Sequence, residues 1–329
     1  MSLKKIADIA GVSPSTASRV LNDPNSTCAS EAVRRRIFDA VRATGYVPSS
    51  AARALKRGVS GTGDSPRISL IFARTTSPDA DPFFSELARH VESELLGAGF
   101  RLGERIFAEG NAALKLSDAD GFVILGRCSD VLLGQFSENT RNLVGLWRNP
   151  AHFPIDEVVC DGKIAAFKAV NHLLSLGHRN IAYIGDCSAE IRYVGYCETL
   201  IGKHVPINYP LIIEVPHTRE SGRSAMESLL SSGKATAVFC ASDSLALGAL
   251  DAMKHRRISK KADVSVISID DITGAEAAGL TTIHIPQHDM AHLAVRLLAD
   301  RISGGHSECA RIEFSCRLIE RDTCFYFAG

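Results

Sequence analysis

The sequence of 329 residues lacks the long apolar runs that would place it in a membrane. No stretch reaches the roughly 18 uncharged apolar residues that a spanning helix needs. Residues 1–10 hold lysines and an aspartate where a secretory signal would hold an apolar segment, so we expect no such signal there. These absences favour a cytoplasmic protein.

Paired cysteines and catalytic signatures are also missing. The nine cysteines are odd in number and never spaced as Cys-x-x-Cys, which argues against a disulfide framework or a zinc site. We expect reduced thiols, no bound metal and no other cofactor. The sequence contains no Gly-x-Ser-x-Gly elbow, no phosphate-binding P-loop and no His-Glu-x-x-His pair, so it offers no catalytic residues. We therefore expect a protein that binds its ligands without chemical turnover.

Charge is segregated along the chain although the formal net charge is zero. Residues 1–58 hold ten Lys or Arg against four Asp or Glu, whereas the remainder holds 27 against 33. A basic segment followed by an acidic body is the electrostatic pattern of a protein that binds a polyanion.

The chain divides into a short helical segment and a long segment of alternating strands and helices. In the first, Ile6, Ile9 and Ala10 are predicted to share one helix face. From Arg67 onwards the pattern predicts strands at 68–73, 121–125, 143–147, 180–185, 237–240 and 264–269, and helices at 82–96, 164–176, 221–230 and 244–255. This alternation is typical of parallel sheets covered on both faces, and its length suggests two lobes.

The most specific pattern is a helix-turn-helix over residues 3–22. Gly11 follows the first helix, where a tight turn requires an unusual backbone angle, and Ser13-Pro14 predicts the start of the second helix. The second helix would lie in the major groove, with hydroxyls for phosphates and an arginine for a guanine edge. Its predicted exposed face consists of Ser13, Ser15, Thr16, Ser18, Arg19 and Asn22.

This run resembles the DNA-binding head of the LacI family, and the match continues through Tyr46-Val-Pro48 and Ser49–Leu55. The resemblance implies a helix-turn-helix domain at 1–48, then a hinge helix and linker at 49–66. It also implies that Pro14, Ser15 and Arg19 contact bases. Leu55 would be a wedge that opens a minor-groove step and bends the DNA, with ordinary packing as the alternative.

The resemblance continues to about Arg321. The matching segments are 81–87, 120–124, 176–185, 237–248, 264–271, 280–283 and 317–321. They imply an effector-binding and dimerisation core at 67–325 that is similar to periplasmic sugar-binding proteins. Lobe 1 would comprise about 67–157 and 287–316, and lobe 2 about 158–286 and 317–325. The predicted fold is therefore an all-α head plus an α/β core of two doubly wound parallel-sheet lobes.

The resemblance also implies where an effector binds. Arg192 and Asp270 match the family's ligand-binding arginine and aspartate, and Ser242 stands where many members have a contacting asparagine. By contrast, Asp243 and Asp271 are expected to cap or brace the fold.

Three aromatic residues complete the predicted effector site. Phe83 and Phe84 would line a wall of the pocket, and Trp147 would stack on the face of a sugar ring. Core packing is the alternative for all three.

The resemblance implies a homodimeric repressor that binds double-stranded operator DNA under the control of a small effector. The short 103–120 segment and the runs at 243–248 and 280–285 resemble a galactoside-linked repressor of the family, which implies a galactoside-like sugar as effector. We expect this effector to act as an inducer. A purine or sugar phosphate remains an alternative effector, and a sugar-binding protein without DNA function is the alternative activity. Because no leucine heptads precede Gly329, we expect a dimer rather than a tetramer.

Overall fold

The computed structural model describes residues 2–22, 28–47, 65–73, 81–108, 118–151, 153–188, 190–255 and 264–327. The chain forms two compact units. Unit 1 comprises 1–77, 84–159 and 287–312, and unit 2 comprises 78–83, 160–286 and 313–329. The predicted hinge helix and its Leu55 lie outside the described residues. Among the residues that the structure describes, no helix combines the length and apolar character needed to span a bilayer.

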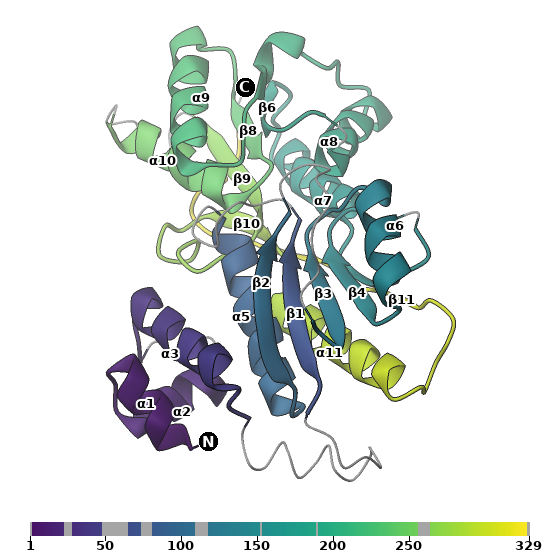
Figure 1. The fold of residues 1–329 in the computed structure, drawn as a ribbon. Helices are drawn as coiled ribbons and strands as arrows, with labels where there is room; N and C mark the ends of the chain where they lie inside the picture. Colours follow the sequence, from purple (N-terminus) through teal and green to yellow (C-terminus); the bar gives the residue numbers. More distant parts are fainter. Residues whose placement is uncertain are drawn as a thin grey trace. The chain divides into compact units, whose positions relative to one another are not determined.

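The N-terminal part of unit 1 is the predicted helix-turn-helix (Figure 1). Its helices are α1 (Leu3–Ala10), α2 (Pro14–Asn22) and α3 (Glu31–Thr44). Gly11 ends α1 with a φ of 66°, and the Ser13 hydroxyl accepts a hydrogen bond from the Thr16 amide at 3.1 Å. The turn and the helix start therefore form as the sequence predicts.

The predicted apolar face of α1 is wrong at one position. Ile9 is 54% exposed, while Ile6, Ala7 and Ala10 are buried. At about 100° per residue, Ile6, Ala10 and Ala7 span one arc and Ile9 lies about 60° outside it. Because α1 packs against both α2 and α3, the arc that contains the small Ala7 is the one buried.

Unit 1 also contains a six-stranded sheet in the order β11-β5-β4-β3-β1-β2. Strands β1 to β5 pair with one another in parallel, and α6 and α11 cover opposite faces of the sheet. The elements are β1 (Arg67–Phe72), α5 (Pro82–Gly97), β2 (Arg101–Phe107), β3 (Gly121–Leu125), α6 (Asp130–Asn139), β4 (Leu143–Trp147), β5 (Asp156–Val159), α11 (Gln287–Ile302) and β11 (Arg311–Glu313).

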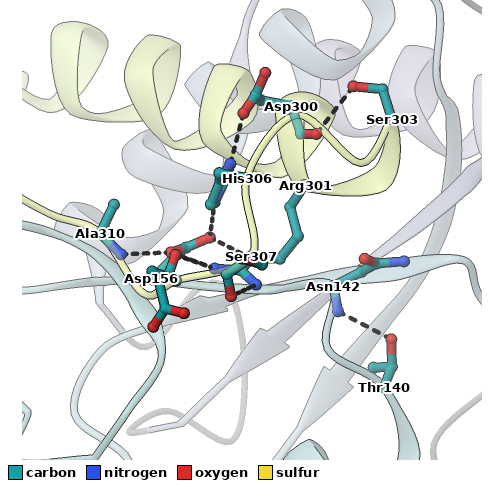
Figure 2. Close-up of polar contacts among 10 residues, drawn as sticks. Thr140, Asn142, Asp156, Asp300, Arg301, Ser303, His306, Ser307 and Ala310 are labelled. Atoms are coloured by element: carbon teal, nitrogen blue, oxygen red, sulfur yellow. Dashed lines mark hydrogen bonds and ion pairs between the residues drawn. The ribbon is translucent and has the colours of Figure 1, made fainter.

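The buried carboxylate of Asp156 anchors the loop that leads to the edge strand β11 of this sheet. Asp156 is 1% exposed and accepts two hydrogen bonds from Arg301, at 2.5 and 2.8 Å. His306 and the amide of Ala310 also bond to it, at 2.9 and 2.8 Å (Figure 2). Burial acts to raise the pKa of Asp156, but these partners outweigh it and hold the pKa below its ordinary value. Asp156 thus fixes the loop that leads to β11.

Unit 2 has a second six-stranded sheet, in the order β12-β10-β9-β8-β6-β7. All its pairs are parallel except β10 with β12. The elements are α7 (Gly162–Ser175), β6 (Ile181–Gly185), α8 (Ile191–Gly202), the short 3-10 helix η1 (Tyr209–Leu211), β7 (Ile212–Glu214), α9 (Arg219–Ser232), β8 (Ala237–Cys240), α10 (Asp243–His255), β9 (Ser265–Asp270), β10 (Thr281–His284) and β12 (Arg317–Ile319). Helices α7 and α8 lie on one side and α9 and α10 on the other, which confirms the predicted doubly wound fold.

Trp147 packs directly on a glycine of its own strand. Gly145 and Trp147 lie two residues apart on β4 and therefore face the same side of the sheet. A Cβ added to Gly145 would lie 2.1 Å from Cη2 of the indole ring. The indole N–H donates to buried Glu157 at 2.5 Å, so the ring is held at this position.

We expect Gly145→Ala to destabilise the protein by about 1–3 kcal/mol, because the added methyl displaces a ring that is already fixed. Urea unfolding measures the change. The matched control is Gly134→Ala in α6, where an added Cβ meets nothing within 4 Å. That change should be neutral or should stabilise by up to about 1 kcal/mol. An unchanged midpoint for Gly145→Ala would contradict the close packing.

Candidate DNA-binding surface and effector site

The outer face of α2 presents the predicted DNA-contacting side chains. Apolar Ala17, Val20 and Leu21 are buried on its inner face. The predicted residues Ser13, Pro14, Ser15, Arg19 and Asn22 are exposed, and Thr16 and Ser18 are half-buried. The structure therefore places all seven described residues of the predicted DNA-binding set on α2 or, for Ser13, immediately before it.

Hydrogen bonds organise the hydroxyl groups on this face. The Ser13 Oγ lies 2.8 Å from both Ser15 Oγ and Thr16 Oγ1, and the Asn22 amide donates to Ser18 Oγ at 3.3 Å. Hydroxyls at a helix N-terminus suit phosphate oxygens, because the helix dipole and its N–H groups favour negative charge there.

The second site lies at the carboxyl edge of the sheet in unit 2. Strands β6, β8 and β9 are adjacent and parallel, so their carboxyl ends meet at the same edge. Asp270 ends β9, Ser242 follows β8, and Arg192 stands in the first turn of α8 after β6. All three are buried, with 2%, 5% and 2% exposure. Such an edge is where open parallel sheets bind ligands.

Arg192 is held rigidly by groups that sequence reasoning missed. Glu190 accepts from its Nε and Nη2, each at 2.8 Å, and the Ala241 carbonyl accepts from Nη1 at 2.5 Å. His217 Nδ1 lies 3.4 Å from Nη2. Burial acts to lower the pKa of Arg192, but Glu190 outweighs it and raises the pKa above its ordinary value. The guanidinium is thus a permanently charged donor of fixed orientation.

Ser242 and Asp270 show features that a ligand would explain. The Ser242 hydroxyl is buried and has no hydrogen-bond partner among the described residues. Leaving such a group unsatisfied costs about 1–3 kcal/mol. Asp270 has a φ of 136°, a backbone conformation that non-glycine residues rarely adopt and that is typical of functional sites.

The two neighbouring aspartates brace the fold, as the sequence predicts. Asp243 accepts from Ser268 and Thr282 hydroxyls, each at 2.6 Å, and from the amide of Ile272 at 2.9 Å. Asp271 accepts from Arg321 at 2.8 Å and lies 2.9 Å from His284 Nδ1. Both side chains therefore hold neighbouring segments of unit 2 together.

The predicted aromatic residues are all buried. Phe83 and Phe84 stand at the start of α5, with Phe83 in unit 2 and Phe84 in unit 1. Trp147 belongs to the core of unit 1, where it packs with α6 residues such as Leu133 and Phe136. The burial of all three residues and the contacts of Trp147 agree with core packing. The roles of Phe83 and Phe84 in a pocket wall and of Trp147 in sugar stacking stay predictions.

Two family models match the chain. The model described as bacterial regulatory proteins, lacI family, matches residues 2–49, which contain α1 to α3. The model described as a periplasmic binding protein-like domain matches residues 170–324, which contain the strands of the sheet in unit 2.

Similar proteins match over nearly the whole chain. The HTH-type transcriptional repressor CytR of Escherichia coli (strain K12) is 32% identical over 337 residues, which cover 97% of this chain and 95% of CytR. The HTH-type transcriptional repressor PurR of Photorhabdus laumondii is 29% identical over 339 residues and covers 97% and 95%. A solved complex of the transcriptional regulator CelR with cellobiose has a TM-score of 0.70 at 27% identity, covering 98% of this chain and 100% of CelR.

We expect the stability of unit 2 to fall as the pH rises from about 4 to about 6. Burial raises the pKa of Asp243 to about 6 from an ordinary 3.8, and three hydrogen bonds offset this only in part. Because the folded state holds the proton more tightly, its contribution is fully present below pH 3.8 and is lost as the pH rises through about 6.

Urea unfolding of the wild type and Asp243→Asn between pH 4 and 7 measures this effect. Asparagine keeps the shape and cannot ionise, so the wild type should lose about 2 kcal/mol relative to the variant across this range. A difference that does not change with pH would contradict the raised pKa.

Proposed function

The chain belongs to the LacI family of bacterial regulatory proteins, and on that premise we propose that it is a transcriptional repressor whose operator binding is controlled by a small, sugar-like effector. One observation carries the proposal. A single chain combines a helix-turn-helix that presents Arg19 and a group of hydroxyls with a buried Arg192–Ser242–Asp270 site at a sheet edge. The first suits operator DNA and the second suits a polar small molecule.

We propose that α2 lies in the major groove, where Arg19 contacts a guanine and the Ser13 and Thr16 hydroxyls contact phosphates. The chain would act in the cytoplasm as a homodimer whose two heads contact the half-sites of a palindromic operator. Leu55 would open the central minor-groove step.

The proposed effector is a sugar with several hydroxyls. Arg192 offers fixed donors and Asp270 a carboxylate, and the Ser242 hydroxyl has no partner within the described part of the chain. Together these groups suit neighbouring hydroxyls on a ring. CelR binds cellobiose, and its likeness to this chain supports a sugar here. We favour a galactoside, and a purine or sugar phosphate is the second candidate. The relatives are transcriptional regulators, so we propose no catalytic role.

The proposed switch is an inducer that binds one conformation of the core more tightly than another. Only a difference in affinity between two states can shift their populations. By the same linkage, operator DNA must weaken effector binding by the factor that effector weakens operator binding.

We expect Arg19→Ala to weaken operator binding by about 1–3 kcal/mol and to relax specificity at one base position. Fluorescence anisotropy with the operator and with single-base variants measures both effects. The control is Arg35→Ala, which removes the same charge from an exposed position of α3. If Arg19→Ala reduces affinity equally for the operator and for random DNA, Arg19 contacts phosphate and does not read a base.

We expect Ser242→Ala and Asp270→Asn to keep operator affinity and to lose the effector response. A thermal-shift screen with galactosides, glucosides, pentoses, sugar phosphates and purines first identifies the ligand. At about a hundred times its Kd it should stabilise the wild type by about 2.7 kcal/mol.

Ser231→Ala, which changes an exposed hydroxyl of α9, is the control and should bind this ligand normally. A full response in both Ser242→Ala and Asp270→Asn would show that the effector binds elsewhere.

A further inference from the structure

Two connections between the units carry a cysteine each. Cys160 is the first residue of unit 2 after β5 ends at Val159. Cys316 comes shortly after the chain leaves unit 1 at Ile312 and immediately precedes β12. Strands β5 and β11, which lead to these cysteines, are neighbours in one sheet. The pairing of the two strands therefore brings two distant parts of the sequence together.

The two thiols interact directly and are shielded from solvent. Cys160 forms a side-chain hydrogen bond with Cys316. Their exposed fractions are 0% and 3%. The Lys168 ammonium of α7 donates to the backbone carbonyl oxygen of Cys316 at 2.8 Å. Cys316 thus contacts a second thiol through its side chain and a cation through its carbonyl group.

This environment makes Cys316 the more nucleophilic of the pair. The hydrogen bond from Cys160 lowers the pKa of Cys316 to about 7, and the charge of Lys168 acts in the same direction, while burial and Asp161 oppose them. Because the thiolate is the reactive form, Cys316 ionises to that form more readily near neutral pH than an ordinary thiol. By contrast, burial raises the pKa of Cys128 to about 11 and that of Cys324 to about 12.

We propose that Cys160 and Cys316 form a reversible disulfide in response to hydrogen peroxide, and that this bridge ties together two connections between the units. The Cys316 thiolate attacks one oxygen of the peroxide and breaks the O–O bond, giving a sulfenic acid and hydroxide. The Cys160 sulfur then attacks the sulfenic sulfur, and its proton leaves with the displaced hydroxyl as water. Overall, two thiols and one peroxide give one disulfide and two waters.

The bridge itself does not depend on the proposed function, but its effect on regulation does. In the proposed switch, the effector changes the core by moving these connections, so a covalent bond between two of them would restrict that movement. The oxidised protein should therefore bind operator DNA and respond less to its effector. Reduction by a dithiol should restore the response.

The bridge is tested on the full-length wild type, reduced and then treated with a small excess of hydrogen peroxide. We expect a mass loss of two hydrogens and, in a non-reducing digest, a linked pair of peptides that contain Cys160 and Cys316. Dithiothreitol should separate them. Cys309→Ser, which removes an exposed cysteine, should give the same linked pair.

In Cys160→Ser, the sulfenic acid of Cys316 has no partner and should be captured by dimedone. The proposal is overturned if the wild type links other cysteines, if Cys316 stays reduced, or if it oxidises singly while Cys160 is present. The wild-type digest gives this answer even if a variant fails to fold.

Operator titrations with the ligand from the screen, before and after oxidation, test the regulatory effect. We expect oxidation to remove at least half of the effector-induced change in operator Kd, and dithiothreitol to restore it. If the bridge forms and the response is unchanged, the regulatory role is wrong. If the reduced protein binds no operator, the proposed function fails while the peptide result stands.

Discussion

Parallel strand pairing is the constraint from which both units of the core follow. Neighbouring parallel strands cannot be joined by a hairpin, so a helix must return the chain between them. These helices cover both faces, as α7 with α8 and α9 with α10 do in unit 2. The same constraint aligns the carboxyl ends of β6, β8 and β9, which places Arg192, Ser242 and Asp270 at one edge. The direction of the strands thus determines where the candidate effector site lies, and the side chains determine what it can bind.

Carboxylates paired with arginines hold the edge strand β11 of unit 1 and the segment after β12 in unit 2. In unit 1, Asp156 binds Arg301 of α11 and the amide of Ala310, and so holds the edge strand β11 in place. In unit 2, Asp271 accepts from Arg321 and holds the segment after β12 against the sheet. Each pair joins residues that are far apart in the sequence. Asp156 is buried, and without its arginine it would be an unpaired buried charge, so this pair selects one arrangement of its segments.

The sequence predicted those features that depend on interactions between residues close together in the chain. The start of α2 at Ser13-Pro14, the turn at Gly11 and strands such as β3 and β4 follow from caps, backbone freedom and apolar runs, and they agree with the structure. Ile9 was misplaced because one short helix contacts two others, and its sequence spacing alone cannot show which arc is buried.

The partners of the candidate site could not be predicted in the same way. Glu190 lies two residues before Arg192, yet only the fold shows that it accepts from two of the three guanidinium nitrogens. The His217 contact and the thiol pair depend on residues brought together by strand order. The resemblance supplied Arg192 and Asp270, whereas the lack of a partner for the Ser242 hydroxyl is visible only in three dimensions.

The contrast between Arg192 and Ser242 bears on how such a site can evolve. Replacing Arg192 would leave the buried Glu190 carboxylate and the Ala241 carbonyl without their hydrogen-bond donor. A viable change at this position therefore requires at least two coordinated substitutions. The Ser242 hydroxyl makes no hydrogen bond to a described residue, so a single substitution there breaks none. Such a substitution can alter the pattern of donors and acceptors offered to a ligand. On the proposed assignment of this site, descendants of this chain can change effector preference through position 242 while the charged contacts of Arg192 are retained.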